Sequence, residues 1–384
     1  MDKQNSNSRV SLVILLTVVL MVTAALTPWQ PGNTTSTVRP SAVKKYLYVA
    51  VPGIRDYLEY GGHGILVYDI ADNYRLLKRI PTSGLKANGT PSNVKGVAVS
   101  LATNSIYITT LEALQRIDLS TEEIVWEKKY DGGCDRLSMS PDGKIIYLPT
   151  LEKEHWNVVD AVTGDVIKQI FTNSGAHNTL YGSDGKQVYL AGLRTPTLGV
   201  SDAHAHTMVK QVGPFTSAVR PFTINGSQTL CYVNVNGLLG FEIGDIKKGT
   251  KLHQVEVDGF QKGPVKRHGC PSHGIGLTPD EKEVWLCDAF NQRMHIFDNT
   301  VMPPRQIASV EVRDQPGWIT FSLDGKHAWP STGEIIDIAT RKTITTLKDE
   351  SGNPVMSEKI IEIHLDGNKA VKAGDQFGIG RIIK

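Results

Sequence analysis

Residues 268–298, HGCPSHGIGLTPDEKEVWLCDAFNQRMHIFD, concentrate side chains that could do chemistry: three histidines, two cysteines and three aspartates. Imidazole, thiolate and carboxylate groups are the usual ligands of zinc and related divalent metals. Imidazole is also the side chain best suited to general base catalysis near neutral pH. The same residues also suit the turns of an ordinary structural repeat, so their role depends on the elements that position them.

A repeat that runs through the chain supplies those elements. Short apolar runs end in an Asp-Gly type turn, and a second run rich in β-branched and aromatic residues follows, as in SMSPDGKIIYLP and TFSLDGKHAWPS. Asp-Gly between two such runs is a strong hairpin signal, because both residues tolerate the positive φ of a tight turn. The turn aspartates are Asp142, Asp184, Asp280, Asp324 and Asp366.

The spacing of these hairpins gives the number of repeats. Successive turn aspartates are 42, 96, 44 and 42 residues apart. The longest interval contains a degenerate turn at Gly226, and one more turn precedes Asp142, near Thr103. A second pair of strand-like runs follows the hairpins, as in HWNVVDAVTGDVIKQI. Seven units of four short strands predict an all-β fold, a seven-bladed β-propeller with four-stranded antiparallel blades.

The two ends of the repeat region predict how the ring closes. The runs YLYVAVPG, GILVYDI and YRLLKRI near the N-terminus have the pattern of a blade's later strands without the first hairpin. The C-terminal run IIEIHLDGNKAV supplies that hairpin. N- and C-terminal strands in one blade would lock the ring. One run, QFGIGRI, is left over, so an eighth partial blade stays open as an alternative.

The units resemble the YVTN-type β-propeller repeats of exported prokaryotic proteins over most of the chain after Lys45, and residues 272–298 also resemble an NHL repeat. The resemblance implies the propeller fold. It does not imply one function, because propellers of this type include adhesion modules, binding scaffolds, lactonases and lyases. Function therefore has to be argued from a site.

The phase of the repeat predicts where such a site lies. The first strand of each propeller blade lines the central channel, so its first residues lie at one rim. Counting back six and seven residues from each hairpin turn gives the residues at this rim. The candidates among them are Asp135, Arg136, His177, Asn178, Arg220, His273 and Trp318. We expect these side chains to meet at one mouth of the channel, with His268 overhanging it from the preceding loop.

Three kinds of chemistry are open at this mouth. His177 and His273 are the candidate catalytic residues, acting as general bases. The same two histidines and Asp135 are the candidate ligands of one divalent metal ion. Arg136 and Arg220 favour an anionic ligand such as a carboxylate, held by bidentate hydrogen bonds. The other ligand-binding candidates are Asp135, Asn178, Trp318 and His268. The alternative is that all of these side chains only hydrate the mouth and bond neighbouring strand ends.

The remaining polar residues of the opening stretch have structural explanations. Asp280 is the turn residue of its hairpin, Asp288 begins an Asx-type turn, and His295 falls in an alternating strand. The cysteines allow either two disulfides, with three possible connectivities, or buried free thiols. They are Cys134, Cys231, Cys270 and Cys287.

The N-terminus predicts export. A basic start precedes an uncharged apolar run at residues 10–26, which is typical of a signal peptide. This run is also at the short end of what spans a bilayer. We therefore expect residues 1–29 to be a signal peptide or an N-terminal membrane anchor, residues 30–44 a polar linker and residues 45–384 the propeller, located in the periplasm or outside the cell.

Two functions follow from these expectations. The first is an exported or membrane-tethered monomer that binds a small anionic ligand or a protein partner at the channel mouth. The second is a lactonase- or lyase-type enzyme that uses the histidine, aspartate and arginine residues there, with or without a metal ion. The balance of 41 Lys and Arg against 39 Asp and Glu gives no reason to expect nucleic acid as a partner.

Overall fold

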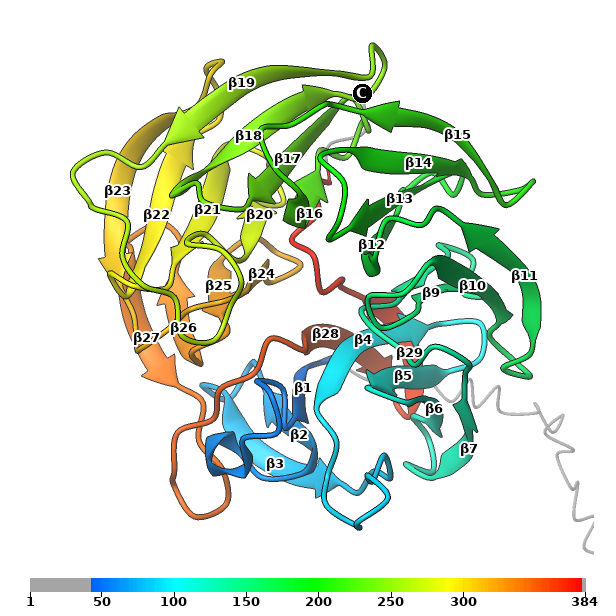
Figure 1. The fold of residues 1–384 in the computed structure, drawn as a ribbon. Helices are drawn as coiled ribbons and strands as arrows, with labels where there is room; N and C mark the ends of the chain where they lie inside the picture. The colour runs from blue at the N-terminus through cyan, green and yellow to red at the C-terminus, as the bar shows by residue number, and fades with distance from the viewer. Residues whose placement is uncertain (1–42, 382–384) are drawn as a thin grey trace, which may run out of the picture. The chain divides into compact units, whose positions relative to one another are not determined.

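The computed structural model describes residues 43–381 and shows a seven-bladed β-propeller (Figure 1). Seven antiparallel sheets form a ring around a central channel. The predicted fold class and number of blades are thereby confirmed. The expected signal peptide or anchor and nearly all of the expected linker lie in residues 1–42, outside the described residues.

Six sheets are each built from four consecutive strands, with the first strand next to the channel and the fourth on the outside (Figure 1). The strands of two of these sheets are β4 Val94–Ser100, β5 Ser105–Thr110, β6 Ala113–Asp118, β7 Ile124–Lys129, β8 Ser138–Met139, β9 Ile145–Pro149, β10 His155–Asp160 and β11 Val166–Phe171. The next two sheets contain β12 Ala176–Tyr181, β13 Gln187–Gly192, β14 Leu198–Asp202, β15 Thr207–Val212, β16 Val219–Ile224, β17 Leu230–Val235, β18 Gly240–Asp245 and β19 Thr250–Glu256. The last two contain β20 Ile275–Leu277, β21 Glu283–Asp288, β22 Arg293–Asp298, β23 Arg305–Glu311, β24 Ile319–Phe321, β25 His327–Pro330, β26 Glu334–Asp337 and β27 Lys342–Thr346.

The core lies between neighbouring blades. The second strands, such as β5 and β13, are buried along nearly their whole length, whereas outer strands such as β23 alternate between exposed and half-buried residues. One cluster joins Tyr147 and Trp156 of one blade to Val188 and Leu190 of the next. Because each blade buries its apolar faces against its two neighbours, the ring has to form as a whole.

The predicted turn aspartates hold the first hairpin of their blades. Asp142 accepts a hydrogen bond from the hydroxyl of Ser140 at 2.6 Å, and Gly143 has the positive φ of 73° that the turn requires. Asp324 accepts an equivalent bond from a serine hydroxyl at 2.7 Å and Asp280 one from a threonine hydroxyl at 2.8 Å. Asp280 therefore serves a turn, as its place in the repeat predicts.

The ring closes through a sheet that combines both ends of the propeller. Its strands are β1 Lys44–Val51, β2 Gly64–Asp69, β3 Arg75–Ile80, β28 Ile360–Asp366 and β29 Lys369–Ala373. Strand β1 pairs with β2 on one side and with β28 on the other, so N- and C-terminal strands share one blade as expected. The C-terminal hairpin contributes its first strand as the inner strand of this blade. Its second strand, β29, is an additional fifth strand beside β28.

The leftover C-terminal run adds no eighth blade to the described part of the chain. Figure 1 shows it crossing the middle of the ring after β29. The backbone carbonyl of Gly378 accepts bonds from Thr223 Oγ1 and Leu277 N, both at 2.8 Å. Phe377 is buried and packs edge-on against Trp318, whose indole N–H donates to the carbonyl of Gln376. This segment therefore fills the channel on one side of Trp318.

The sequence leaves open whether the four cysteines form disulfides. All four cysteines are buried free thiols, so the alternative without disulfides holds in this structure.

The one short helix found between residues 43 and 381 is the 3-10 turn η1 Leu58–Tyr60. Nothing in this range is a helix of the length and hydrophobicity that would cross a bilayer.

Candidate functional site

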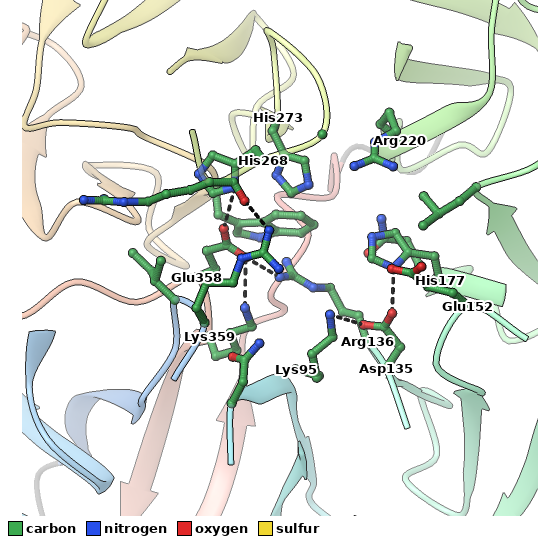
Figure 2. A pocket seen from close by; sticks show the side chains of 18 residues that line it. Lys95, Asp135, Arg136, Glu152, His177, Arg220, His268, His273, Glu358 and Lys359 are labelled. Atoms are coloured by element: carbon green, nitrogen blue, oxygen red, sulfur yellow. Dashed lines mark hydrogen bonds and ion pairs between the residues drawn. The ribbon is translucent and has the colours of Figure 1, made fainter. Parts of the chain in front are cut away.

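The strand entrances of all seven blades surround a cavity of about 110 Å³ at one mouth of the channel (Figure 2). The structure brings all eight candidate site residues to its wall. These are Asp135, Arg136, His177, Asn178, Arg220, His268, His273 and Trp318. At about 10–15 Å³ of such space per water molecule, the cavity has room for a ligand of on the order of eight non-hydrogen atoms.

The first cluster in the cavity is built on Asp135, which is almost completely buried. His177 Nδ1 lies 2.6 Å from Asp135 Oδ2, and Lys95 Nζ lies 3.2 Å from Asp135 Oδ1. Burial acts to raise the pKa of Asp135, but the attraction of His177 and Lys95 outweighs it and lowers this pKa to about 2. The carboxylate is therefore ionised at neutral pH and holds His177 with a proton on Nδ1.

His177 is consequently prepared to accept a proton. Burial lowers the pKa of His177 below its ordinary value, against the opposing attraction of Asp135. With Nδ1–H donating to Asp135, Nε2 is left as an unprotonated acceptor. A neutral imidazole oriented by a buried carboxylate is the arrangement used by general bases in many enzymes.

The second cluster surrounds Glu358, which enters the cavity just before β28. Arg136 Nη2 and Lys359 Nζ each lie 2.9 Å from Glu358 Oε2, and His268 Nδ1 lies 3.4 Å from Oε1. Burial acts to raise the pKa of Glu358, but the attraction of Lys359, His268 and Arg136 outweighs it and keeps this pKa well below its usual range. The guanidinium of Arg136 also stacks 3.3 Å from the centroid of a Trp318 ring.

His268 and His273 stand side by side above Glu358, with ring centroids 4.7 Å apart and planes inclined by 20° (Figure 2). His273 Nδ1 lies 2.9 Å from the carbonyl of Gly317, and His268 Nε2 lies 3.3 Å from the carbonyl of Gln315. Because a carbonyl only accepts, each of these nitrogens carries the proton of its ring. Burial lowers the pKa of both histidines.

Several polar atoms in the cavity have no partner. Arg220 Nε, Arg136 Nη1 and both amide atoms of Asn178 are buried without a hydrogen bond. Within residues 43–381, Arg220 forms no ion pair with a carboxylate, and the Cys270 thiol lies close to its guanidinium. Gly269 leaves the space for Arg220, because a Cβ there would lie 2.2 Å from Arg220 Nη2. Unpaired buried groups of this kind are costly unless a ligand or water satisfies them.

The charge of the cavity favours an anion. Six lysine or arginine side chains and three carboxylates line it. When the histidines are neutral this gives a net charge between about +2 and +3 at pH 7, because burial lowers the pKa of Lys359 to about 7. A second, shallower depression of about 530 Å³ adjoins the cavity and shares Arg55, Asn93, Lys95 and Glu152 with it. Lys153 and Arg194 extend the basic surface there.

The predicted metal ligands are only partly brought together. His177 and Asp135 are in contact, but His273 is grouped with His268 and Glu358 instead. In the described part of the chain, these last three are the residues whose donor atoms all lie within 4.8 Å of one another.

Counting along the repeat missed Lys95 and Glu358. Both lie eight residues before their hairpin turns, one position earlier than the two that the prediction used. Extending the count by one residue would have found them.

The other polar residues of the opening stretch are structural. Asp288 Oδ2 lies 3.0 Å from His295 Nε2, and Asp288 also accepts hydrogen bonds from the backbone and side chain of Asn291. His295 Nδ1 lies 2.8 Å from Ser309 Oγ. Asp288 and His295 are buried and Asn291 is half-buried within one blade, and none of the three lines the cavity.

Comparison with models of known protein families gives no match to this chain, and neither does comparison with curated protein sequences.

Proposed function

We propose that this propeller is a binding module for a small organic anion, held at the channel mouth by Arg220, Arg136 and Asn178. The observation that carries the proposal is Arg220, a guanidinium in the cavity wall whose Nε is buried without a hydrogen-bond partner and which has no carboxylate partner in the described residues. A charged group taken out of water needs a counter-charge with matching hydrogen bonds. The carboxylate or phosphate of a ligand would supply both.

The cavity supports a ligand of limited size. Its own volume, about 110 Å³, suits the anionic head of a ligand, and the adjoining basic depression can hold a larger remainder. The face of Trp318 is occupied by Arg136, so that ring supports the guanidinium and is not free to stack on a ligand.

The setting that we propose is outside the cytoplasm. Two features support it, both from the sequence: the apolar run at residues 10–26 and the resemblance to YVTN-type repeats of exported proteins. We propose the propeller as a monomer, secreted or tethered by its N-terminus.

Replacing Arg220 with glutamine should weaken anion binding by about 10- to 100-fold, since a charged hydrogen bond is worth about 1.5–3 kcal/mol. Isothermal titration with malate, citrate, glucuronate and inorganic phosphate measures this, and Arg305→Gln on an exposed outer strand is the matched control. The unfolding free energy of ligand-free Arg220→Gln should equal or exceed that of the native protein, because the variant removes an unpaired charge. Wild-type affinity in Arg220→Gln, or no saturable binding of any of these anions to the native protein, would contradict the proposal.

A second candidate function is an enzyme of lactonase or lyase type, and the 2.6 Å contact between His177 and Asp135 is the observation that favours it. Nε2 of His177 would take the proton from an attacking water, or from a carbon next to a carboxylate. Arg220 or Arg136 would stabilise the oxyanion that develops.

The replacement His177→Gln tests this candidate. It should lower kcat by about 100- to 10,000-fold, the usual contribution of a general base. Lactone hydrolysis can be followed with a pH indicator, and elimination by the absorbance of the unsaturated product. His204→Gln, at an exposed histidine, is the control. Equal turnover by His177→Gln and the native protein would exclude His177 as the base.

A further inference from the structure

The cluster of His268, His273 and Glu358 has a feature that anion binding does not require. Each histidine donates one ring N–H to a backbone carbonyl, at 2.9 Å for His273 and 3.3 Å for His268. The remaining nitrogens, His273 Nε2 and His268 Nδ1, are therefore free to act as ligands. Metal-binding histidines almost always have this outer hydrogen bond, because it fixes the tautomer and orients the ring.

Glu358 likewise has one atom held by hydrogen bonds and one atom available to a metal ion. Arg136 and Lys359 both bond Oε2, which leaves Oε1 facing His268 at 3.4 Å. A carboxylate that binds a metal through one oxygen and accepts hydrogen bonds through the other is a common outer-shell arrangement. One donor atom from each of the three residues lies within 4.8 Å of the donor atoms of the other two.

We infer that His268, His273 and Glu358 form a binding site for a divalent transition metal ion of the zinc type. Two imidazoles and one carboxylate form a ligand set of known catalytic zinc centres, and such a set leaves a fourth position open, here toward the cavity. Magnesium and calcium prefer all-oxygen ligands and are disfavoured. The site is distinct from the set of His177, His273 and Asp135 expected from the sequence, and it goes beyond the binding of an anion.

Binding the ion requires a small rearrangement. The two rings are nearly parallel, so one has to turn for both nitrogens to point at a single ion. His268 is the ring that turns, because its bond of 3.3 Å to Gln315 is longer than the 2.9 Å bond of His273. Gly317 leaves the required space. A Cβ at that position would lie 2.2 Å from His268 Cε1 and 2.7 Å from Glu358 Oε1.

The surrounding charges determine what else the ion would hold. Arg136, Lys359 and Arg220 lie in the same cavity and disfavour an isolated cation. An ionised Glu358 and an anionic ligand at the open position compensate for the repulsion between these cationic side chains and the metal ion. The ion is therefore expected to bind more tightly when phosphate or a carboxylate is present, and by linkage the anion binds more tightly when the ion is present.

The experiment uses the full-length chain, freed of metal with a chelator and then titrated with Zn²⁺, Co²⁺ or Mn²⁺ chloride. Elemental analysis after dialysis should give one equivalent of zinc, and bound cobalt should show visible ligand-field absorption. Zinc should bind more tightly than manganese. Removing a ligand in His268→Ala or His273→Ala should weaken zinc binding by more than about 100-fold, and Gly317→Ala, which keeps all ligands but displaces His268, by about 10- to 100-fold.

Three outcomes separate this inference from its alternatives. His204→Ala, at an exposed histidine, should bind zinc like the native protein. Zinc binding lost in His177→Ala but kept in His268→Ala would overturn the inference in favour of the set expected from the sequence. No stoichiometric zinc or cobalt in the native protein at micromolar free metal would also overturn it. Cobalt absorption in the native protein tests the site even where a variant fails to fold.

Discussion

Replacing Glu358 with glutamine is expected to lower the free energy of unfolding by about 3–5 kcal/mol, the usual cost of breaking a buried ion pair. Among residues 43–381, Glu358 is the one carboxylate in contact with Arg136, Lys359 and His268, and its side chain is only 8% exposed. Glutamine keeps the shape but removes the charge. The Arg136 guanidinium would then remain in the cavity without a counter-charge, and Lys359, whose pKa burial already lowers to about 7, would be largely neutral at pH 7.

Urea unfolding at pH 7 measures this change, with Glu311→Gln as the control. Glu311 pairs with Arg293 at 2.8 Å, but its side chain is 75% exposed, so its loss should cost less than about 1 kcal/mol. The double variant Arg136→Met/Glu358→Gln should have a higher free energy of unfolding than Glu358→Gln alone, because it removes a cation together with its partner. Equal unfolding free energies for Glu358→Gln and the native protein would show that the cluster is hydrated and not structural.

The repeat explains why much of the site could be predicted from the sequence. Asp142 and Asp324 fix the turns of their hairpins, and each turn fixes the phase of the strand before it. Positions six and seven residues earlier therefore reach the same rim in every blade, which places Asp135, His177 and Arg220 around one cavity. Backbone periodicity alone fixes these positions wherever the strands are regular.

The parts that could not be predicted depend on irregular backbone and on side-chain direction. The place of His268 over the mouth follows from its position in the loop before the blade, but its grouping with His273 and Glu358 does not, because no period applies in a loop. The segment around Phe377 follows the last repeat and has no partner segment to reveal its place in the channel. The contact of His177 with Asp135, and of His273 with His268, depends on side-chain rotamers that repeat phase leaves open.

Replacing Asp135 with asparagine is expected to lower the free energy of unfolding by about as much as Glu358→Gln does. The pH dependence of this loss identifies its cause. The carboxylate contacts Lys95 at 3.2 Å and His177 at 2.6 Å and is 1% exposed. At pH 7 the variant leaves Lys95 without a counter-charge, so the free energy of unfolding should fall by about 3 kcal/mol. The pKa of His177 should also fall further, because Asp135 is the group that raises it.

The sign of the pH effect follows from the pKa of about 2 that Asp135 has in the folded protein, below its ordinary value of 3.8. A carboxylate with a lowered folded-state pKa stabilises the fold above the unfolded-state pKa, and this stability disappears as the pH falls through the folded-state value. The contribution of the Asp135 carboxylate to the difference in unfolding free energy between the native protein and Asp135→Asn should therefore be constant from pH 7 to about pH 5, and it should shrink by about 2 kcal/mol between pH 4 and pH 2. Between pH 7 and pH 5 the difference should widen, because His177 binds its proton more weakly in the variant.

Urea unfolding of both proteins at pH 7, 5, 4, 3 and 2.5 checks the prediction for Asp135. Asp165→Asn is the control, because Asp165 pairs with Lys128 through a side chain that is 70% exposed, and its replacement should change the unfolding free energy by less than about 1 kcal/mol at any of these pH values. A difference in unfolding free energy between the native protein and Asp135→Asn that is as large at pH 2.5 as at pH 4 would show that packing, and not charge, is what asparagine disturbs. A difference that shrinks over this range would show that the Asp135 carboxylate is ionised in the folded protein, which is the state that orients His177 as the base of the second candidate function.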